Sequence, residues 1–229
     1  MTAAPIESIP VHPRFVSLEG GEGAGKTTVL NALRETLKAT GAEVVCTREP
    51  GGTPLAERIR GLLLDAGPEA VHESPAAETE LLLMFAARAQ HVRETVLPAL
   101  RRGAWVLSDR FTDSSHAYQG GGRGLDPAFI AELERRVVGI APGLTLLLDV
   151  GVTEGRDRAR GRACAAGTPG PDRIEREHDG FFERVRDAFL ARAQADTARF
   201  RVLDATRPAG DVAADAVARL RAYRDGAAA

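Results

Sequence analysis

Several features are scarce in this sequence, and their scarcity excludes whole classes of protein. The two cysteines, Cys46 and Cys164, lie far apart, and neither forms a CxxC or Cys/His pattern. This argues against a disulfide framework or a zinc site and favours a reducing compartment, the cytoplasm. The longest apolar runs, such as Leu81 to Ala87, fall far short of the roughly 20 residues that a membrane-spanning helix needs.

Neither sign of charge is in excess. The chain has 30 Lys+Arg and 32 Asp+Glu, which gives a formal net charge of -2. This balance argues against a protein that coats nucleic acid or a membrane surface, so any anion site must be local. Lysine itself is rare, because Lys26 and Lys38 are the only two. A lysine in this chain therefore calls for a specific explanation.

The pattern of apolar residues predicts an α/β fold. The 229 residues are 44% hydrophobic, which is enough for one sizeable core. Short β-rich runs alternate with longer helical patterns, which is typical of βαβ units around a five-stranded parallel sheet flanked by helices. The expected strands cover 15–18, 43–47, 104–108, 144–149 and 200–203, and the expected helices cover 26–38, 55–64, 79–100, 127–138, 153–160, 178–199 and 211–224.

No linker divides the chain into two domains. We predict one domain over 14–226 and a flexible extension over 1–13, which lacks the basic-then-apolar order of a signal peptide. The stretch 162–171 is rich in Ala, Gly and Pro, so we expect a mobile surface loop there.

A phosphate-binding motif directly follows the first expected strand. The sequence from Gly20 to Thr27 matches GxxxxGK[ST] and leads into a helix, as a P-loop requires. In such a loop the backbone N–H groups converge on phosphate oxygens, Lys26 reaches the β- and γ-phosphates, and Thr27 ligates Mg²⁺. The residues predicted to bind ATP are Gly20, Gly21, Glu22, Gly23, Ala24, Gly25, Lys26, Thr27 and Thr28.

The motif alone does not decide the function, because switches, motors and kinases share it. No segment like the guanine-reading NKxD is present, and the chain is too short for a motor with accessory domains. A kinase acting on a small molecule is therefore favoured.

Three further segments carry a family resemblance. They are TREPGGT at 47–53, DR at 109–110 and AYQGGGRG at 117–124, and each follows an expected strand. Together with the P-loop they resemble the bacterial thymidylate kinases, a family of P-loop nucleoside monophosphate kinases, from Arg14 to about Val217. The resemblance implies the P-loop NTPase fold with a mobile lid, a homodimer built through helices, and the reaction ATP + dTMP = ADP + dTDP in dTTP biosynthesis.

The resemblance also implies roles for charged residues. Arg110, Arg48 and Arg60 would hold the dTMP phosphate, because guanidinium forks grip phosphate oxygens bidentately. Asp109 would lie near Mg²⁺, and Glu22 would approach the sugar hydroxyl and the metal. No strong general base is required for phosphoryl transfer to a phosphate acceptor.

Recognition of the base and sugar is expected from two segments. Arg88, Ser115 and Gln119 would meet the polar edge of the pyrimidine, and Tyr118 would crowd the sugar 2′ position. For stacking on the base, several relatives carry an aromatic residue at the position of Met84. We prefer Phe85 at the next position, with a place in the core as the alternative.

The lid is expected at about 156–174. This P-loop has no arginine, and the corresponding subclass takes its catalytic arginine from the lid. We assign that role to Arg158 or Arg162 and favour Arg162. The predicted catalytic residues are thus Lys26, Asp109, Arg110, Arg158 and Arg162, and those predicted to hold the metal are Thr27 and Asp109.

Two alternatives remain open at this point. The first is a kinase whose acceptor is another pyrimidine monophosphate, such as dUMP or UMP. A P-loop regulatory ATPase is the second alternative, but it leaves the DR and YQGGGRG segments unexplained. The five histidines form no metal-binding pattern and are expected to be structural or exposed.

Overall fold

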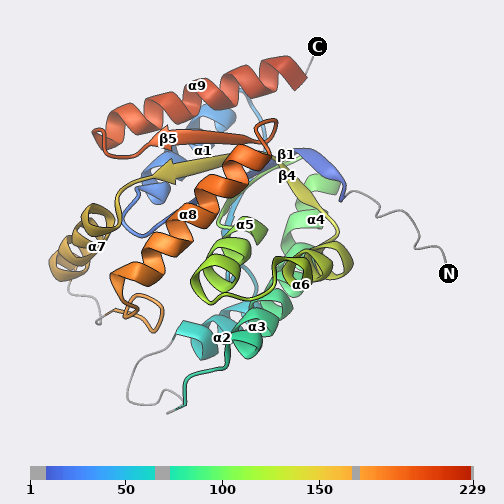
Figure 1. The fold of residues 1–229 in the computed structure, drawn as a ribbon. Helices are drawn as coiled ribbons and strands as arrows, with labels where there is room; N and C mark the ends of the chain where they lie inside the picture. The colour runs from blue at the N-terminus through green and yellow to red at the C-terminus, as the bar shows by residue number, and fades with distance from the viewer. Residues whose placement is uncertain (1–8, 65–72, 167–170, 228–229) are drawn as a thin grey trace.

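The computed structural model describes residues 9–64, 73–166 and 171–227, with side chains except at 162–166 and 227 (Figure 1). Its centre is a five-stranded, fully parallel sheet in the order β2-β3-β1-β4-β5, which confirms the predicted architecture. The strands are β1 (Val11–Gly20), β2 (Val44–Arg48), β3 (Trp105–Asp109), β4 (Ala141–Asp149) and β5 (Phe200–Asp204).

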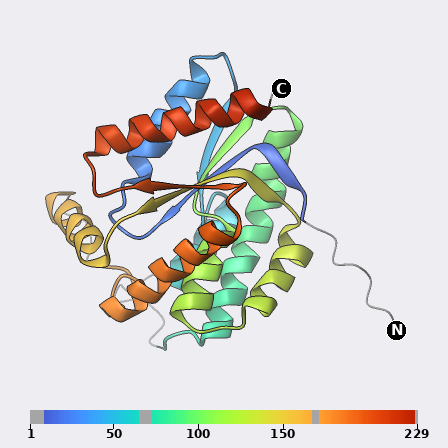
Figure 2. The same cartoon turned by 45° about the horizontal axis from the view of Figure 1, so that its top comes forward.

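Helices cover both faces of this sheet. Figures 1 and 2 show α1 and α9 on one face and α3, α5 and α8 on the other. The helices are α1 (Lys26–Lys38), α2 (Pro54–Leu64), α3 (Ala77–His91), α4 (Leu97–Arg101), α5 (Thr112–Ser115), α6 (Pro127–Leu133), α7 (Val152–Ala166), α8 (Asp179–Ala195) and α9 (Ala209–Ala227), and short π-helical segments are η1 (Val92–Val96), η2 (His116–Gly122) and η3 (Glu134–Val138).

The spacing of apolar residues explains how α1 and α9 attach to the sheet. In α1 the buried residues Val29, Leu33 and Leu37 recur every four positions and so line one face. They form one core cluster with the sheet residues and with the apolar stripe of α9. Burying each such side chain contributes about 1.5–3 kcal/mol. The predicted bounds of α1, 26–38, coincide with the observed helix.

The first strand is longer than its apolar run indicates. It begins at Val11, four residues before the predicted start, and Val11 pairs with Ala141 of β4. Residues 11–13 therefore belong to the sheet rather than to the extension predicted over 1–13. Val11 and Arg14 are exposed, so hydrophobicity gave no signal there, and the register with β4 defines the strand.

The sequence did not predict the helical stretch formed by α5 and η2. Its run of three glycines at 120–122 looks like a loop, but here it permits close packing against α8. A Cβ on Gly121 would lie 2.6 Å from the Cβ of Ala188, and one on Gly122 would lie 2.5 Å from the Phe181 ring. These glycines therefore provide space for a neighbouring helix.

Helix α7 extends further than expected. It continues to Ala166, so 162–166 is helical where we predicted a surface loop. Arg162 and the alanines at 163, 165 and 166 are good helix formers, which explains the extension. Of the predicted loop, residues 167–170 lie outside the described part of the chain.

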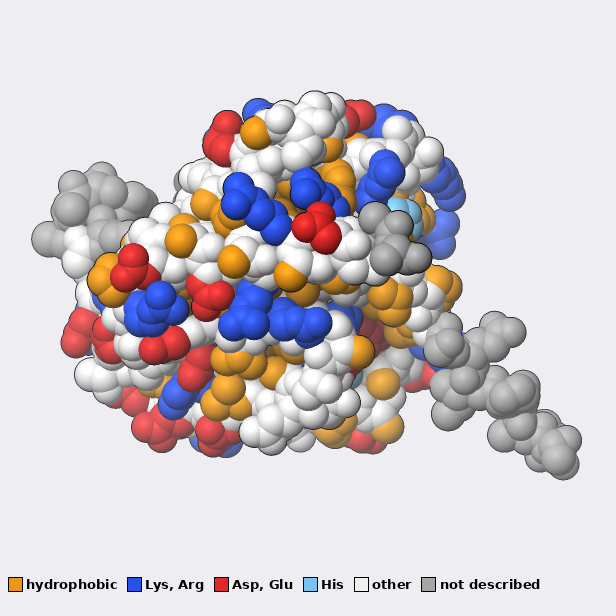
Figure 3. Space-filling model, turned by 90° about the horizontal axis from the view of Figure 1, so that it is seen from above, with side chains coloured by type: hydrophobic (Ala, Val, Ile, Leu, Met, Phe, Trp, Pro, Cys, Tyr) orange, Lys and Arg blue, Asp and Glu red, His pale blue; other side chains and the backbone are white. Residues whose placement is uncertain are grey.

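The surface carries no broad patch of one charge on the face shown in Figure 3. Basic and acidic side chains are interspersed there, in agreement with the formal net charge of -2. Among the described residues, no helix combines the length and apolar character needed for a transmembrane span.

Candidate active site

The P-loop connects β1 directly to α1. Positive φ angles of 68° at Gly23 and 92° at Gly25 explain why glycine is needed at these turns. The Lys26 ammonium donates hydrogen bonds to the carbonyl oxygens of Gly20 (3.2 Å) and Gly21 (2.8 Å), so its side chain lies back along the loop. Burial and the nearby Arg110 guanidinium lower the pKa of Lys26 to about 8. The nearby carboxylates of Asp109, Glu19 and Glu22 offset the cost of burying this ammonium only in part, as expected of a group that receives phosphate.

The P-loop also touches the first turn of α7 through backbone alone. A Cβ on Gly23 would lie 1.9 Å from the carbonyl oxygen of Gly155, and one on Gly155 would lie 2.5 Å from the carbonyl oxygen of Glu22. Both positions therefore require glycine. The contact fixes the start of α7 against the phosphate-binding loop.

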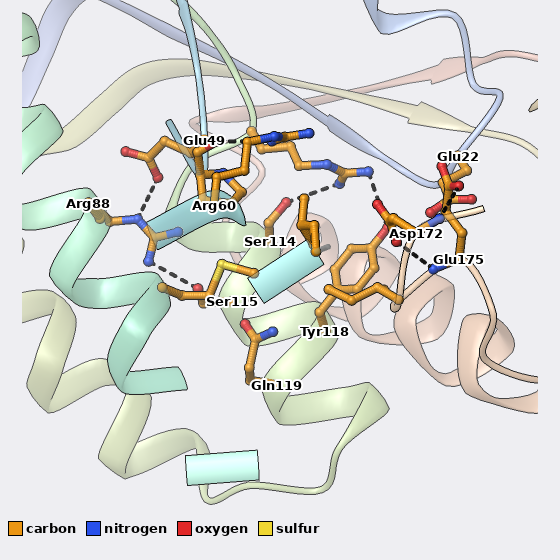
Figure 4. A pocket seen from close by; sticks show the side chains of 15 residues that line it. Glu22, Glu49, Arg60, Arg88, Ser114, Ser115, Tyr118, Gln119, Asp172 and Glu175 are labelled. Atoms are coloured by element: carbon orange, nitrogen blue, oxygen red, sulfur yellow. Dashed lines mark hydrogen bonds and ion pairs between the residues drawn. The ribbon is translucent and has the colours of Figure 1, made fainter. Parts of the chain in front are cut away.

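A cavity of about 170 Å³ opens beside the P-loop, at the carboxyl ends of the strands, and we call it the acceptor cavity. Figure 4 shows the side chains around it. The lining residues are Glu22, Glu49, Pro50, Arg60, Leu64, Met84, Arg88, Arg110, Ser114, Ser115, Tyr118, Gln119, Asp172, Ile174 and Glu175.

Arg110 joins the acceptor cavity to the P-loop. It follows β3 with a φ of 71°, the only positive φ of a non-glycine residue in the described chain. Such strain is concentrated at functional sites. Its guanidinium donates to the Gly20 carbonyl oxygen at 2.9 Å, the Ser114 hydroxyl at 3.2 Å and the Tyr118 hydroxyl at 3.2 Å.

Asp109 carries an unsatisfied oxygen beside this arginine. Among the described residues, its buried Oδ1 has no hydrogen-bond partner. A buried carboxylate oxygen without a donor is costly unless a cation or water completes it. Thr27 lies exposed at the start of α1. A carboxylate and a hydroxyl are oxygen donors of the kind that Mg²⁺ prefers, so these two residues fit the predicted metal.

Arg88 is held by a buried network. Its Nε donates to Glu49 Oε2 at 2.6 Å, and its Nη1 donates to the Ser115 hydroxyl at 3.0 Å. The other Glu49 oxygen bonds the His91 ring at 2.8 Å, and His91 in turn bonds Thr47 at 2.7 Å. Burial alone would raise the pKa of Glu49, but Arg88 and His91 lower it below its usual range. Arg88 is therefore fixed beside the cavity as a charged pair.

Phe85 does not line the acceptor cavity, which corrects the preferred prediction. Its side chain is buried in the core cluster that covers the α3 face of the sheet. The Arg88 guanidinium lies over its ring, 4.7 Å from the centroid. Met84, the alternative position, lines the cavity instead. Residues three and four positions before Arg88 both approach its face of the helix, so spacing alone could not decide between them.

The far end of the cavity is formed by α5 and η2. Ser115, Tyr118 and Gln119 are buried and line it, as Figure 4 shows. The Tyr118 ring meets Phe181 and Phe189 edge-on, each with ring centroids 6.2 Å apart. This packing holds its hydroxyl toward Arg110.

The two other predicted phosphate ligands occupy different positions. Arg60 lines the cavity and donates to the Pro50 carbonyl oxygen at 2.9 Å. Burial and the neighbouring Arg48 lower its pKa. Arg48 is exposed, pairs with Glu57 at 3.0 Å, and is not among the lining residues.

Acidic residues form one wall of the cavity. Glu22, Asp172 and Glu175 all line it, and the sequence had predicted only Glu22. Burial and the Glu175 carboxylate raise the pKa of Glu22 to about 7. Glu49 lies inside the TREPGGT segment but had no assigned role, and Ser114 and Glu175 gave no sequence signal, because a single serine or glutamate matches no motif.

A second, open cavity of about 760 Å³ lies on the other side of the P-loop between α7 and the start of α9. Arg158 lines it and donates to the carbonyl oxygens of Ala205 (2.6 Å) and Thr206 (3.2 Å). The Arg162 side chain lies outside the described residues. Asp149, at the end of β4, is paired with Arg186 at 2.7 Å.

Comparisons with known proteins agree with this geometry. The family model "Thymidylate kinase" matches residues 18–216. The chain is 53% identical over 201 residues to the thymidylate kinase of Pseudomonas savastanoi pv. phaseolicola, covering 87% of this chain and 91% of that protein. It is 50% identical over 196 residues to the thymidylate kinase of Methylococcus capsulatus, covering 85% and 88%.

A solved structure is similar as well. The crystal structure of thymidylate kinase from Ehrlichia chaffeensis superimposes with a TM-score of 0.71 at 30% identity, covering 90% of this chain and 97% of that one. The similarity therefore spans the sheet, the P-loop and the acceptor cavity together, and this chain belongs to the thymidylate kinase family.

Proposed function

We propose that the chain transfers the γ-phosphoryl group of ATP to dTMP, which gives ADP and dTDP for dTTP biosynthesis. The observation that carries this proposal is the acceptor cavity, which contacts the P-loop at one end and a buried polar cluster at the other. Two cavity arginines, Arg60 and Arg110, suit an anionic acceptor. The different chemistry of the two ends then sets the orientation of dTMP, with its phosphate toward the P-loop and its base toward Gln119.

On the donor side, the P-loop N–H groups and the positive end of α1 bind the ATP phosphates. Lys26 exchanges its two carbonyl partners for the β- and γ-phosphates. Thr27 and Asp109 hold Mg²⁺, which supplies charge neutralisation at the transferring group when it is bound. Thr28, Gly23 and Ala24 border the open cavity beside α7, where the rest of ATP has room.

On the acceptor side, Arg110 and Arg60 grip the dTMP phosphate in the bidentate manner of guanidinium groups. Arg110 is also bonded to the last carbonyl of β1, so it sets the acceptor in line with the P-loop. Arg48 lies outside the cavity, where it pairs with Glu57 and adds positive charge beside Arg60. Glu22 approaches the sugar hydroxyl from the opposite wall.

At the base end, Met84 packs on the pyrimidine and Phe85 supports Arg88 from below. Arg88 donates to a base carbonyl, with Ser115 and Gln119 completing the polar edge. Tyr118 occupies the space next to the sugar 2′ position. The transition-state charge is met by a lid arginine, and we retain Arg162, because Arg158 is already engaged by two carbonyl groups.

The protein works as a cytoplasmic homodimer in this proposal. Cys46 carries a free thiol, which is typical of a reducing compartment. Helices α2 and α3 expose Leu55, Leu62 and Leu82, and α6 exposes Phe129. Exposed apolar side chains of this size suit a contact between two copies. Sedimentation equilibrium of the wild type tests the dimer, and a purely monomeric protein would exclude it.

The deciding experiment measures ADP formation from Mg-ATP with no acceptor, dTMP, dUMP, UMP, CMP, AMP or GMP. We expect strong stimulation by dTMP, weaker stimulation by dUMP and little by UMP. Preference for UMP or dUMP would favour the alternative pyrimidine kinase. An equally slow rate with every acceptor would favour a regulatory ATPase and exclude the kinase.

A further inference from the structure

Glu80 is a buried carboxylate that the reaction described above does not use. It lies on α3, only 1% exposed, and three side chains donate to it. Gln119 Nε2 bonds its Oε1 at 2.8 Å, and its Oε2 accepts from Arg173 at 2.6 Å and from Arg123 at 3.1 Å. Burial would raise the pKa of Glu80, but the bonds from Gln119 and the two arginines lower it. Glu80 is therefore ionised and can only accept hydrogen bonds.

This restriction fixes the Gln119 amide. Only the NH₂ end of an amide can donate, so the NH₂ end of Gln119 is the one that must face Glu80. The carbonyl end is consequently left for the acceptor cavity, which Gln119 lines while remaining 1% exposed. Figure 4 shows the amide of Gln119 reaching toward the same space as Ser115 and Tyr118.

The cavity thus presents one fixed acceptor and one fixed donor to a base. The acceptor is the Gln119 carbonyl, and the donor is Arg88, whose orientation Glu49 and Ser115 set. A thymine or uracil ring offers an N3–H donor beside a carbonyl acceptor, which complements this pair. Cytosine has an unprotonated N3 and an amino group at these positions, so both contacts become unfavourable. Buried mismatches of this kind discriminate strongly.

We propose that Glu80 is a specificity-determining positioning residue, which holds the Gln119 amide so that the acceptor site takes pyrimidines with an N3–H and rejects cytosine. The inference rests on the proposed dTMP site. Glu80 touches no substrate and acts through Gln119. A neutral amide at position 80 would bond Gln119 in either orientation, and the restriction would be lost.

The same carboxylate also anchors the chain segment that closes the cavity. Arg173 bonds Glu80 and the Leu63 carbonyl oxygen (2.8 Å), and the adjacent Ile174 lines the cavity. If Glu80 had a purely structural role, its replacement would therefore lower kcat/KM equally for every acceptor. A change in the ratio of kcat/KM between bases distinguishes the positioning role from the structural one.

The test compares wild type with Glu80→Gln and measures kcat/KM for dTMP, dUMP and dCMP with Mg-ATP. We expect the dTMP/dCMP ratio to fall at least tenfold, whereas the dTMP/dUMP ratio stays within twofold, because both bases carry an N3–H. Arg173→Met and Glu177→Gln are the matched controls. Arg173→Met removes the anchor, and Glu177→Gln removes the charge of the second partner of Arg123, which lies 2.5 Å from Glu177. Both variants should leave the dTMP/dCMP ratio unchanged.

An unchanged dTMP/dCMP ratio in folded Glu80→Gln protein would overturn the inference. If that variant does not fold, Gln119→Leu replaces it, since loss of the amide must also erase the discrimination. Full discrimination in Gln119→Leu would again overturn the inference. A wild type without dTMP-dependent ADP formation would instead contradict the proposed function, so the two failures are distinguishable.

Discussion

The acceptor cavity and the P-loop face each other but are held in different ways. Around the cavity, Arg88 and Gln119 are buried, Arg110 is half-buried, and all three are bonded to fixed partners. In the P-loop, Thr27 and Thr28 are exposed, and within the described part of the chain Lys26 donates only to carbonyls of its own loop. The acceptor cavity is thus organised by its own hydrogen bonds, whereas in the proposed function Lys26 exchanges its internal bonds for bonds to phosphate.

The largest expected effect tests whether the two sides are separable. Lys26→Ala should lower kcat about 10³-fold or more, because charge at the transferring phosphate is lost. Binding of dTMP, measured by calorimetry, should stay within threefold. Lys38→Ala, the other lysine, is the matched control, since it lies exposed at the end of α1. A large loss of dTMP binding in Lys26→Ala would show that the two sides are not independent.

The second prediction concerns the lid arginines on the donor side. Arg162→Ala should lower kcat about 10²- to 10³-fold with little change in thermal stability. Arg158→Ala should have the smaller effect on kcat, because Arg158 bonds Ala205 and Thr206. Single-turnover assays of both variants check this. Intact turnover in Arg162→Ala together with its loss in Arg158→Ala would reverse the assignment.

The third prediction compares two arginines on the acceptor side. Arg88→Ala leaves the buried Glu49 carboxylate without its main partner, and the free energy of unfolding should fall by about 3–5 kcal/mol. Arg48→Ala breaks an exposed pair with Glu57 and should cost under about 1 kcal/mol. Urea unfolding measures both. Similar costs for the two variants would contradict a preorganised cavity.

The smallest expected effect concerns Glu22, which belongs to the P-loop and also lines the acceptor cavity. Glu22 has a pKa of about 7 when folded, above its ordinary value of 4.5. Between these values the native state holds the proton and the unfolded chain does not, so ligand-free stability falls as pH rises. Relative to the wild type, the free energy of unfolding of Glu22→Gln should therefore rise little at pH 4 and by about 1 kcal/mol at pH 8, after solvent screening.

Urea unfolding of the ligand-free protein at both pH values tests this prediction. Glu35→Gln is the control, because Glu35 is exposed beside Arg34 on α1 and its pKa is lowered by that bond. It should show no gain at pH 8. An equal gain for Glu22→Gln at pH 4 and pH 8 would show that Glu22 is not protonated in the ligand-free protein.

The fold could be predicted from the sequence because the spacing of apolar residues clearly distinguishes the strands from the helices. The five strands lie where β-rich runs predicted them, and the P-loop marked the end of β1. The helix over 112–122 was missed, because its glycines suggest a turn until the neighbouring α8 is known. The start of β1 at Val11 was missed for a similar reason, since pairing with β4 rather than hydrophobicity determines it.

For the site, the sequence could predict residues that belong to recognised motifs, but not residues outside them. Arg110, Tyr118 and Gln119 were identified by resemblance and do line one cavity. Glu80 could not be found, because a lone glutamate resembles any surface residue until its buried partners are known, and Glu49 lay in the TREPGGT segment without an assigned role. Met84 and Phe85 differ by about 100° around the helix axis, and only the tertiary packing determines which one meets the cavity.

The glycine-to-glycine contact between Gly23 and Gly155 has a mechanical consequence. With no side chains between them, the P-loop backbone and the first turn of α7 cannot slide past each other by repacking. A side chain introduced at either position would have to push the first turn of α7 away from the P-loop.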